Sequence, residues 1–260
     1  MPIISLLTDF GLHDEYAGML KAILWSLAPN CQIIDLTHQI PPQDVLQGAL
    51  MLGRATPYFP PGSIHLAIVD PGVGTNRRPI AARLGEQYFV GPDNGLFSLP
   101  LQTAEQNQAP IEIVHLNQPQ FWLPSLSASF HGRDLFAPVA AQLANGTPLS
   151  QLGSPVHNPQ RLTLPQPEPL PNGWRAHVLH CDQFGNLATD LHRSKVNAPH
   201  LRIIAAGQLL PFVHTFGDAA PGQLIALFDS SGQLTLAVVN GSAAQRLNAG
   251  VGFTLEAYCD

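Results

Sequence analysis

Short acidic turns follow several apolar runs of this 260-residue chain, and their side chains could bind a polar small molecule. Each turn places an aspartate near a glycine, where a ligand can approach both a carboxylate and bare backbone. Ligands of open α/β sheets bind outside the carboxyl ends of the strands. We therefore expect four such turns to lie along one sheet edge: TDFG at 8–11 with Asp14, DPGVG at 70–74, GPDNG at 91–95 and DQFGN at 182–186.

The same turns have an ordinary structural explanation. Asp, Asn and Gly populate tight turns for conformational reasons alone, and PDNG at 92–95 is a strong turn sequence by itself. Four acidic turns on one edge favour a binding site, but composition does not decide between the two interpretations.

A second candidate is the segment SFHGRD at 129–134, which precedes a predicted helix. Arg133 and Asp134 suit a charged helix entry, since an acidic side chain is favoured near the positive end of the helix dipole. His131 is either a functional group or a hydrogen-bonded loop histidine, and the local sequence leaves both open.

Several motifs with a known chemistry are absent from the chain. It contains no GxxxxGK[ST], no GxGxxG after the first strand and no HExxH, which excludes a P-loop, a Rossmann fingerprint and a zinc protease motif. The pair Arg77-Arg78 after DPGVGT could be a solvated surface pair. Spacing leaves open a divalent metal site formed by Asp9, Asp70 and His131.

Composition limits the classes of function. The formal charge is −6, and the 12 Lys and Arg residues form no basic run that would follow nucleic-acid phosphates, so no nucleic-acid partner is expected. No apolar run approaches the roughly 20 residues that span a bilayer, and the N-terminus lacks the basic start of a signal peptide. The cysteines lack metal or disulfide spacing, which predicts reduced thiols in a cytoplasmic protein: Cys31, Cys181 and Cys259.

The elements that must position these groups follow from the periodicity of apolar residues. Strands alternating with helices predict an α/β domain with a parallel sheet over residues 1–155. The proline-dense run 156–173 predicts a semi-rigid linker, and short strands beyond it predict a small β domain over 174–260. In the first domain we expect strands at 2–7, 31–36, 63–70 and 111–116, a hairpin within 80–91, and helices ending before Pro29 and spanning 44–56 and 136–144.

Six motifs in matching order resemble those of one family. Besides the four acidic turns, the first of which extends to D.Y.G..K, the chain carries SFHGRD and the NGSA of 240–243. It is similar over essentially its whole length to the SAM hydroxide adenosyltransferases, or SAM hydrolases, which are related to the fluorinating and chlorinating SAM enzymes. The resemblance implies an N-terminal α/β sheet domain, a linker and a small C-terminal β-barrel. It also implies a homotrimer, with each active site between the N-terminal domain of one subunit and the C-terminal domain of the next.

The activity implied by the resemblance is hydrolysis of S-adenosylmethionine (SAM) to adenosine and methionine. SAM is the substrate, and neither a metal nor a cofactor is implied. Asp70, Arg77 and His131 match the residues that handle water. These residue types suit the reaction, because the sulfonium leaves without needing a proton and only one water must be held behind C5′ and activated.

The resemblance also implies the binding residues. Asp9 matches the carboxylate that takes both ribose hydroxyls through charge-assisted hydrogen bonds. The other implied contacts are Asp14, Tyr16 and Asp182 near the methionine ammonium, Ser230 at the methionine carboxylate, Phe184, Asn186, Phe216 and Asn240 around the adenine, and Phe130 and Gly132 within SFHGRD.

Three positions separate this chain from the halogenating branch. That branch has an aromatic residue where this chain has Asp70, a threonine at Val73 and often a serine at Gly132. Those residues help to hold the halide, so halogenation is not expected. Where the halogenases have a Ser-Arg pair for the methionine carboxylate, this chain reads DSSG at 229–232.

Two other functions stay open at this level. One is a metal-dependent nucleotide or nucleoside hydrolase with Asp9, Asp70 and His131 as ligands, which metal analysis of the purified protein would distinguish. The other is a non-catalytic adenosine-binding or sensor protein, which would retain adenosine without cleaving SAM.

Overall fold

The computed structural model describes residues 1–198 and 200–259. Pro199 and Asp260, both within the predicted C-terminal domain, lie outside the described residues. The chain separates into two compact units, Met1–Leu162 and Thr163–Asp260.

The helices and strands of each unit have the following bounds. The first unit contains β1 (Ile3–Thr8), α1 (Tyr16–Leu27), β2 (Gln32–Thr37), α2 (Val45–Ala55), β3 (Ile64–Ile68), β4 (Pro79–Leu84), β5 (Gln87–Pro92), α3 (Ser98–Gln106), β6 (Ile111–His115), α4 (Ala137–Ala144) and β7 (Ser154–Pro155). The second contains β8 (Glu168–Leu170), β9 (Gly173–Cys181), β10 (Leu187–His192), β11 (Leu201–Ala205), β12 (Gln208–Leu210), β13 (Leu224–Phe228), β14 (Gln233–Val238), α5 (Ala243–Leu247) and β15 (Thr254–Cys259).

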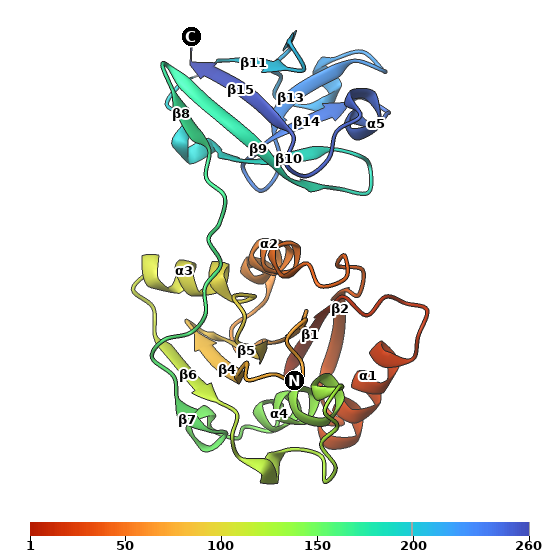
Figure 1. The fold of residues 1–260 in the computed structure, drawn as a ribbon, viewed down its shortest axis with the longest axis vertical. Coiled ribbons are helices and arrows are strands. Elements are labelled where there is room, and N and C mark those ends of the chain that lie inside the picture. The colour runs from red at the N-terminus through yellow and green to blue at the C-terminus, as the bar shows by residue number, and fades with distance from the viewer. Residues whose placement is uncertain (199, 260) are drawn as a thin grey trace. The chain divides into compact units, whose positions relative to one another are not determined.

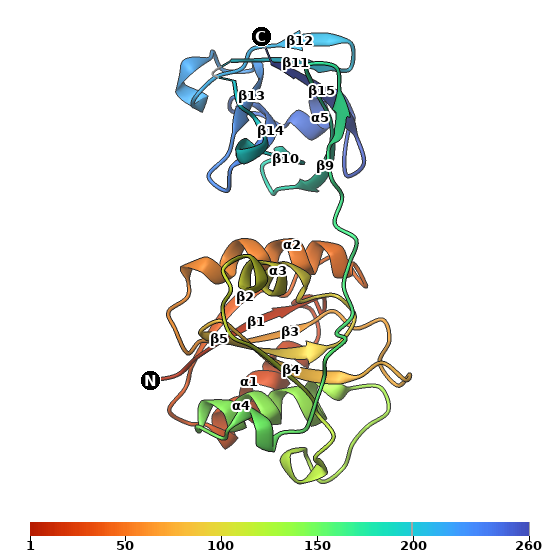
Figure 2. The same cartoon turned by 90° about the vertical axis from the view of Figure 1, so that its left-hand side faces the viewer.

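The first unit is a three-layer sandwich, in which α1 and α4 cover one face of a sheet and α2 and α3 cover the other (Figures 1 and 2). The strand order is β2-β1-β3-β5-β4-β6-β7. β1 pairs in parallel with β2 and β3, and β3 pairs in parallel with β5, whereas β4 is antiparallel to both β5 and β6. The sheet is therefore mixed: the hairpin expected within 80–91 is confirmed as β4–β5, and the expected parallel pairing holds from β2 to β5. Only Gly85 and Glu86 join β4 to β5, too few residues for the crossover that a parallel pair needs.

The inner strands β1, β3, β4 and β5 are buried on both faces, whereas the edge strand β2 is largely exposed. Burial on both faces explains why the inner strands read as apolar runs. Leu20 and Leu24 of α1 share one core cluster with Phe136, and Leu52 of α2 shares the other with Phe89. Burial of each such side chain contributes about 1.5–3 kcal/mol. The layered core thereby fixes the strand ends from which the polar turns project.

The neighbouring parallel strands β1, β3 and β5 end at one edge of the sheet. That edge carries the acidic turns at 8–14, 70–74 and 91–95. The fourth turn, 182–186, joins β9 to β10 in the second unit, so the expectation of four turns on one edge is wrong for this turn. Its sequence resembles the others because a strand end is followed by the same turn residues in either kind of sheet.

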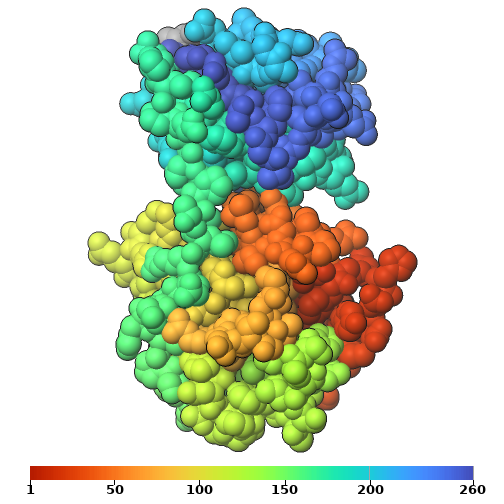
Figure 3. Space-filling model, in the orientation of Figure 1, coloured from red at the N-terminus to blue at the C-terminus, as the bar shows by residue number. Residues whose placement is uncertain are grey.

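Much of the segment predicted as a linker, 156–173, is packed against one unit or the other. Residues 156–162 lie along the surface of the first unit (Figure 3). Gln160 donates its backbone N–H to the Asp93 carboxylate at 2.7 Å. Strand β8 pairs with β9 in the second unit, so only residues 163–167 connect the two packed stretches.

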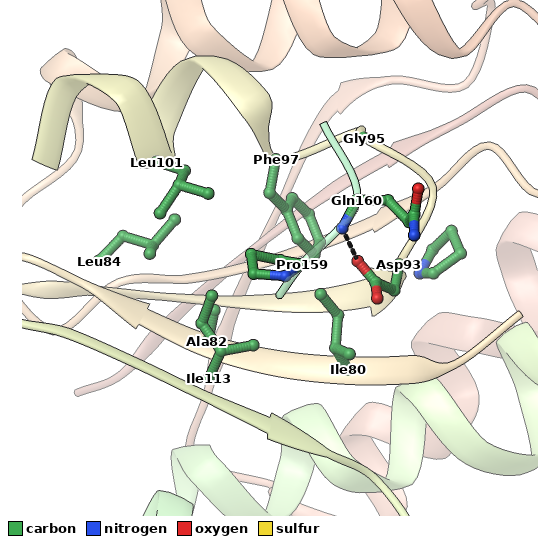
Figure 4. A pocket seen from close by; sticks show the side chains of 11 residues that line it. Ile80, Ala82, Leu84, Asp93, Gly95, Phe97, Leu101, Ile113, Pro159 and Gln160 are labelled. Atoms are coloured by element: carbon green, nitrogen blue, oxygen red, sulfur yellow. Dashed lines mark hydrogen bonds between the residues drawn. The ribbon is translucent and has the colours of Figure 1, made fainter. Parts of the chain in front are cut away.

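Asp93 of the GPDNG turn is buried beneath this segment (Figure 4). Its carboxylate also accepts a hydrogen bond of 2.8 Å from Arg78 Nε, and Arg78 donates further to Asn158. A cavity of about 10 Å³, the room of roughly one water, remains beside Pro159. The structural interpretation therefore accounts for Asp93, which anchors the linker.

The second unit is a nearly closed antiparallel barrel with the strand order β12-β11-β15-β9-β10-β14-β13. A bridge between Phe212, just after β12, and Ala226 of β13 joins the outer strands. Ala176 and Val178 of β9 are buried while their neighbours are partly exposed, as the twofold period of a strand requires. Apolar periodicity did not predict the short elements β8, β12 and α5, nor α3 in the first unit and β10, whose sequence LATDLH mixes polar and apolar residues.

The three cysteines are unpaired thiols. Burial raises the pKa of the Cys31 thiol, with a smaller opposing effect of a backbone hydrogen bond. Among the described residues, no helix has the length and apolar character needed to cross a bilayer.

Candidate active site

Asp70 follows β3, and the loop after it returns an arginine to its carboxylate. Arg77 donates from Nε to both Asp70 oxygens, at 2.9 and 3.0 Å, and from Nη2 to Oδ2. Both side chains are nearly buried, with 7% of Asp70 and 9% of Arg77 exposed. Such forked, charge-assisted hydrogen bonds fix the position and direction of the carboxylate.

His131 meets the same guanidinium from a different element. It stands directly before a π-type turn, Gly132–Phe136, which leads into α4. Arg77 Nη2 lies 2.9 Å from His131 Nδ1. Because an arginine only donates, Nδ1 is the acceptor and the ring proton is on Nε2. Burial, and next the charge of Arg77, lower the pKa of His131, so the imidazole is neutral at pH 7.

An aromatic ring also holds Arg77 in place. The guanidinium carbon lies 5.2 Å from the ring centroid of Phe136, a fully buried residue. A cation over a desolvated ring gains about 2 kcal/mol. The Asp70–Arg77–His131 set is therefore ordered by the protein itself.

Two loops around this set pack on each other. Gly74 has a φ of +76°, and a Cβ added there would lie 2.7 Å from the carbonyl oxygen of Ala128. Asp134 fixes the second loop, because its carboxylate accepts from the Ser127 N–H at 2.7 Å and from Arg133 Nε at 2.6 Å. The charged pair at the helix entry is thus structural, and it supports the loop that precedes His131.

An aromatic cluster adjoins the histidine. Phe10, Tyr16 and Phe130 pack edge to face, with ring centroids 5.2 to 5.9 Å apart. A Cβ added at Gly132 would lie 3.2 Å from both Phe130 Cε2 and Ile68 Cδ1. Tyr16 is 41% exposed, so the cluster presents an aromatic surface next to His131.

Asp9 lies in the turn after β1, and its Oδ2 accepts a hydrogen bond of 2.8 Å from the backbone N–H of Gln43. Gln43 has a left-handed φ of +67°, which is uncommon outside glycine. Sequence reasoning missed Gln43 because a backbone donor is not encoded by residue type. The one available signal was the proline pair before it, at 41–42. Asp14 is exposed just ahead of α1.

The second unit gathers predicted residues in the turn between β9 and β10. The Asp182 carboxylate accepts from the N–H groups of Phe184 and Asn186, both at 2.9 Å, and from Asn186 Nδ2 at 2.8 Å. These bonds shape the turn and leave Phe184 76% exposed. Gly185 packs closely on Ser242, which brings the DQFGN and NGSA motifs together.

One further barrel residue lies at the same end of the β10–β14–β13 strands, since Asn240 follows β14 with a φ of +55°. Phe216 lies in the connection between β12 and β13, with 44% of its surface exposed. The antiparallel register places the end of β14 beside the starts of β10 and β13. Ser230 lies at the opposite end, in a turn held by Asp229 through Ser231. The structure does not bring Ser230 to the other predicted barrel residues.

Within residues 1–198 and 200–259, no group of three or more His, Cys, Asp or Glu side chains is placed to hold a metal ion. The Asp70 carboxylate instead faces a guanidinium, which would repel a divalent cation at that position. Asp9, Asp70 and His131 therefore do not form the metal site that their spacing left open.

Two family models match the chain: the SAM hydroxide adenosyltransferase N-terminal domain over residues 4–153, and the corresponding C-terminal domain over residues 176–256. The chain belongs to the SAM hydroxide adenosyltransferase family. The family and its architecture, an α/β domain followed by a β-barrel, are confirmed as predicted from the six motifs.

Relatives named as SAM hydrolases and relatives named as fluorinases match nearly the whole chain. An (R)-S-adenosyl-L-methionine hydrolase of Salinispora tropica is 43% identical over 249 residues, 95% of this chain and 94% of the relative. A fluorinase of Actinoplanes sp. is 27% identical over 291 residues, 98% of this chain and 96% of the relative. The crystal structure of an uncharacterized protein from Thermotoga maritima matches with a TM-score of 0.89 and 33% identity, covering 99% of this chain and all of that one.

Proposed function

We propose that this chain hydrolyses SAM to adenosine and L-methionine. The observation that carries the proposal is the Asp70–Arg77–His131 set, in which one nearly buried guanidinium lies within hydrogen-bond distance of both a carboxylate and a neutral imidazole. A relative named as an (R)-SAM hydrolase is 43% identical over 95% of the chain. The name of this relative specifies the (R) epimer at sulfur, and we propose the same preference for this chain.

The reaction needs one water in line with the bond from C5′ to sulfur. Asp70 accepts a hydrogen bond from this water, and His131 donates to the water oxygen from Nε2. As the C5′–O bond forms, the electron pair of the C5′–S bond moves to sulfur, and the sulfonium becomes a neutral thioether. The proton of the water passes to Asp70 and leaves to solvent with the products. A desolvated site favours this step because the negative Asp70 carboxylate and the positive sulfonium both become neutral.

The rest of the substrate is assigned to groups near this set and in the barrel. Asp9, oriented by Gln43, binds the two ribose hydroxyls, while Asp14 and Tyr16 lie toward the methionine ammonium. The barrel of a neighbouring copy supplies the adenine contacts, among them the exposed ring of Phe184. A homotrimer would form three equivalent sites from one pair of surfaces. We place the protein in the cytoplasm, where its three unpaired thiols would stay reduced.

The direct test is incubation of chelator-treated protein with each sulfonium epimer of SAM, followed by chromatography. We expect equal amounts of adenosine and methionine, formed from the (R) epimer. No product above the enzyme-free control would refute hydrolysis, and adenosine retained without cleavage would indicate a binding protein. Product that appears only after a divalent metal is added would refute the metal-free mechanism.

Substitution of the water-activating carboxylate tests the mechanism itself. Asp70→Ala should lower kcat by roughly 10²–10⁴-fold and leave adenosine affinity nearly unchanged, since the ribose ligand Asp9 remains. Glu105→Gln is the matched control, because Glu105 also pairs with an arginine, Arg161, but on the exposed surface. Equal turnover of the Asp70→Ala and Glu105→Gln variants would remove Asp70 from the mechanism.

A further inference from the structure

A line of hydrogen bonds joins helix α1 to the turn after β1 through side chains that the proposed mechanism does not use. Lys21 Nζ donates to Asp35 Oδ2 at 2.6 Å, and the other Asp35 oxygen lies 3.2 Å from His38 Nε2. His38 Nδ1 lies 2.8 Å from Thr8 Oγ1. The Thr8 hydroxyl in turn accepts from the Phe10 N–H at 3.2 Å.

One arrangement of protons satisfies every member of this network. Burial acts to raise the pKa of Asp35, but the hydrogen bonds from Lys21 and His38 outweigh it and lower the pKa, so Asp35 is an acceptor only. His38 then donates from Nε2 and accepts at Nδ1 from the Thr8 hydroxyl. Loss of the Thr8 hydroxyl or of the His38 ring would leave a buried partner unsatisfied.

The two ends of the network are the first and last residues of the first motif. In TDFG…D.Y.G..K, Thr8 is the first residue and Lys21 the last, and neither has a role in the proposed binding or catalysis. The side chain of His38 between them is only 2% exposed. The network thus explains why a threonine and a lysine accompany the acidic residues of this motif.

The segment that follows His38 lies along the turn that carries Asp9. The Gly11 N–H donates to the His38 carbonyl at 2.7 Å, and the Gln43 N–H donates to Asp9 Oδ2 at 2.8 Å. The first of these hydrogen bonds sets the position of the backbone just after Asp9, and the second sets the direction of the Asp9 carboxylate. His38 anchors this segment to β1 through Thr8.

We propose that His38 is a positioning residue of the ribose site, which holds the 8–11 turn and the 38–43 segment in the register that lets Asp9 meet both ribose hydroxyls. The inference rests on the proposed function, because it takes Asp9 as the ribose ligand. Two vicinal hydroxyls require a carboxylate in one orientation, and a ligand group is held in place by the side chains behind it. Disorder of this support weakens ribose recognition before it affects the chemistry at C5′.

The test compares two nucleosides that differ only at the ribose hydroxyls. Calorimetry would give the Kd of adenosine and of 2′,3′-dideoxyadenosine for the full chain and for the variants Thr8→Val and His38→Gln. In the unmodified chain we expect adenosine to bind at least roughly tenfold more tightly, the value of one hydrogen bond to a charged group. In both variants we expect this ratio to fall several-fold, with a raised KM for SAM and a kcat changed less than KM.

A matched control exists on the same strand. The Ser5 hydroxyl lies 2.6 Å from Nδ1 of His65, another buried histidine. Within the part of the chain that the structure describes, neither of these two side chains hydrogen-bonds to the 8–11 turn. Ser5→Ala removes a comparable hydrogen bond from the core and should keep the full preference for adenosine. If His38 only stabilised the fold, its substitution would weaken the binding of both nucleosides equally and would leave the ratio of their Kd values unchanged.

The outcomes separate this inference from the proposed function. Equal affinity of the unmodified chain for both nucleosides would overturn Asp9 as the ribose ligand. A preference that survives in Thr8→Val and His38→Gln would overturn the positioning role and leave SAM hydrolysis untouched. If either variant fails to fold, Lys21→Met replaces it at the partly exposed end of the network, where an unchanged ratio would likewise contradict the inference.

Discussion

His131 accepts a hydrogen bond from Arg77, so its role depends on a ring without a proton on Nδ1. An imidazolium at this position would point N–H at the guanidinium 2.9 Å away, and the two cations would repel each other. Burial, followed by the charge of Arg77, therefore lowers the pKa of His131. His131 therefore stays neutral at pH values at which an ordinary histidine begins to take up a proton.

The pH dependence of catalysis should report this histidine. Acidification should leave kcat/KM unchanged until the pH falls below the ordinary histidine value of about 6.5, because the free enzyme loses activity only when His131 takes up a proton. A pH–rate profile with (R)-SAM would measure it, with His157→Asn as the control at an exposed histidine. An acid limb centred at or above the ordinary value would contradict the assignment.

The elements around the site include a histidine with a purely structural role. His65 of β3 is fully buried, stacks on Phe89 with ring centroids 4.9 Å apart, and contacts Ser5 of β1. Burial lowers the pKa of His65 to about 4, against a smaller opposite effect of Gln87. The packing of β1 and β3 therefore requires a neutral ring.

Acidification should destabilise the fold through His65. Unfolded chains bind this proton near pH 6.5 and the folded chain only near pH 4, so the stabilisation is complete above about pH 6.5 and is lost as pH falls. The free energy of unfolding should drop by about 2 kcal/mol between about pH 7 and about pH 5 from this residue alone. Urea titrations at several pH values would measure how steeply the free energy of unfolding changes with pH. The double variant Ser5→Ala with His65→Leu should reduce this pH dependence, and an unaltered pH dependence would disprove the prediction.

The loop after β3 depends on a glycine for its contact with the loop before α4. Gly74 and Gly62 both have a left-handed φ, +76° and +80°, but only Gly74 would place a Cβ against backbone, 2.7 Å from an oxygen of Ala128. We expect Gly74→Ala to lower stability by roughly 1–3 kcal/mol more than Gly62→Ala, and to lower kcat because the loop carries Asp70 and Arg77. Thermal unfolding and turnover of the two variants check this; equal effects would show that the contact is unimportant.

For the whole molecule, the groups proposed to act on SAM are divided between two compact units. The water-handling set and Asp9 belong to the first unit, while Phe184 and its neighbours belong to the barrel. Each unit has its own core, so a substitution in one unit removes no core contact of the other. This independence permits a test of the proposed trimer by mixing.

Two inactive variants should restore activity when they assemble together. Asp70→Ala is defective in the first unit and Phe184→Ala in the barrel. Suppose that each site joins the first unit of one subunit to the barrel of the next. In randomly mixed trimers, about a quarter of the sites then combine an unaltered first unit with an unaltered barrel. We expect about that share of the unmodified activity after co-refolding at low SAM, and no comparable activity from either variant refolded alone. Trimers measured by light scattering without this recovery would refute sites shared between subunits.

The sequence by itself determined the family and the class of each unit, and it predicted residues for the candidate site, although not Gln43. Apolar runs and helical spacing are local properties, so they predict strands and helices without knowledge of the rest of the chain. Six ordered motifs were sufficient to indicate the SAM hydroxide adenosyltransferases. The sequence did not predict the shortest elements, because β8, β12 and α5 have too few residues to show a period.

Only the tertiary structure decided which acidic turn meets Arg77 at the candidate active site and which turns hold the fold. Asp70, Asp93 and Asp182 follow strands in similar turns, yet one meets Arg77, one anchors the linker and one shapes its own turn. Their partners come from positions that folding alone brings near, and a residue type does not reveal its partner. For the same reason the contact of His38 with Thr8, across 30 positions, was invisible until β1 and the segment after β2 lay side by side.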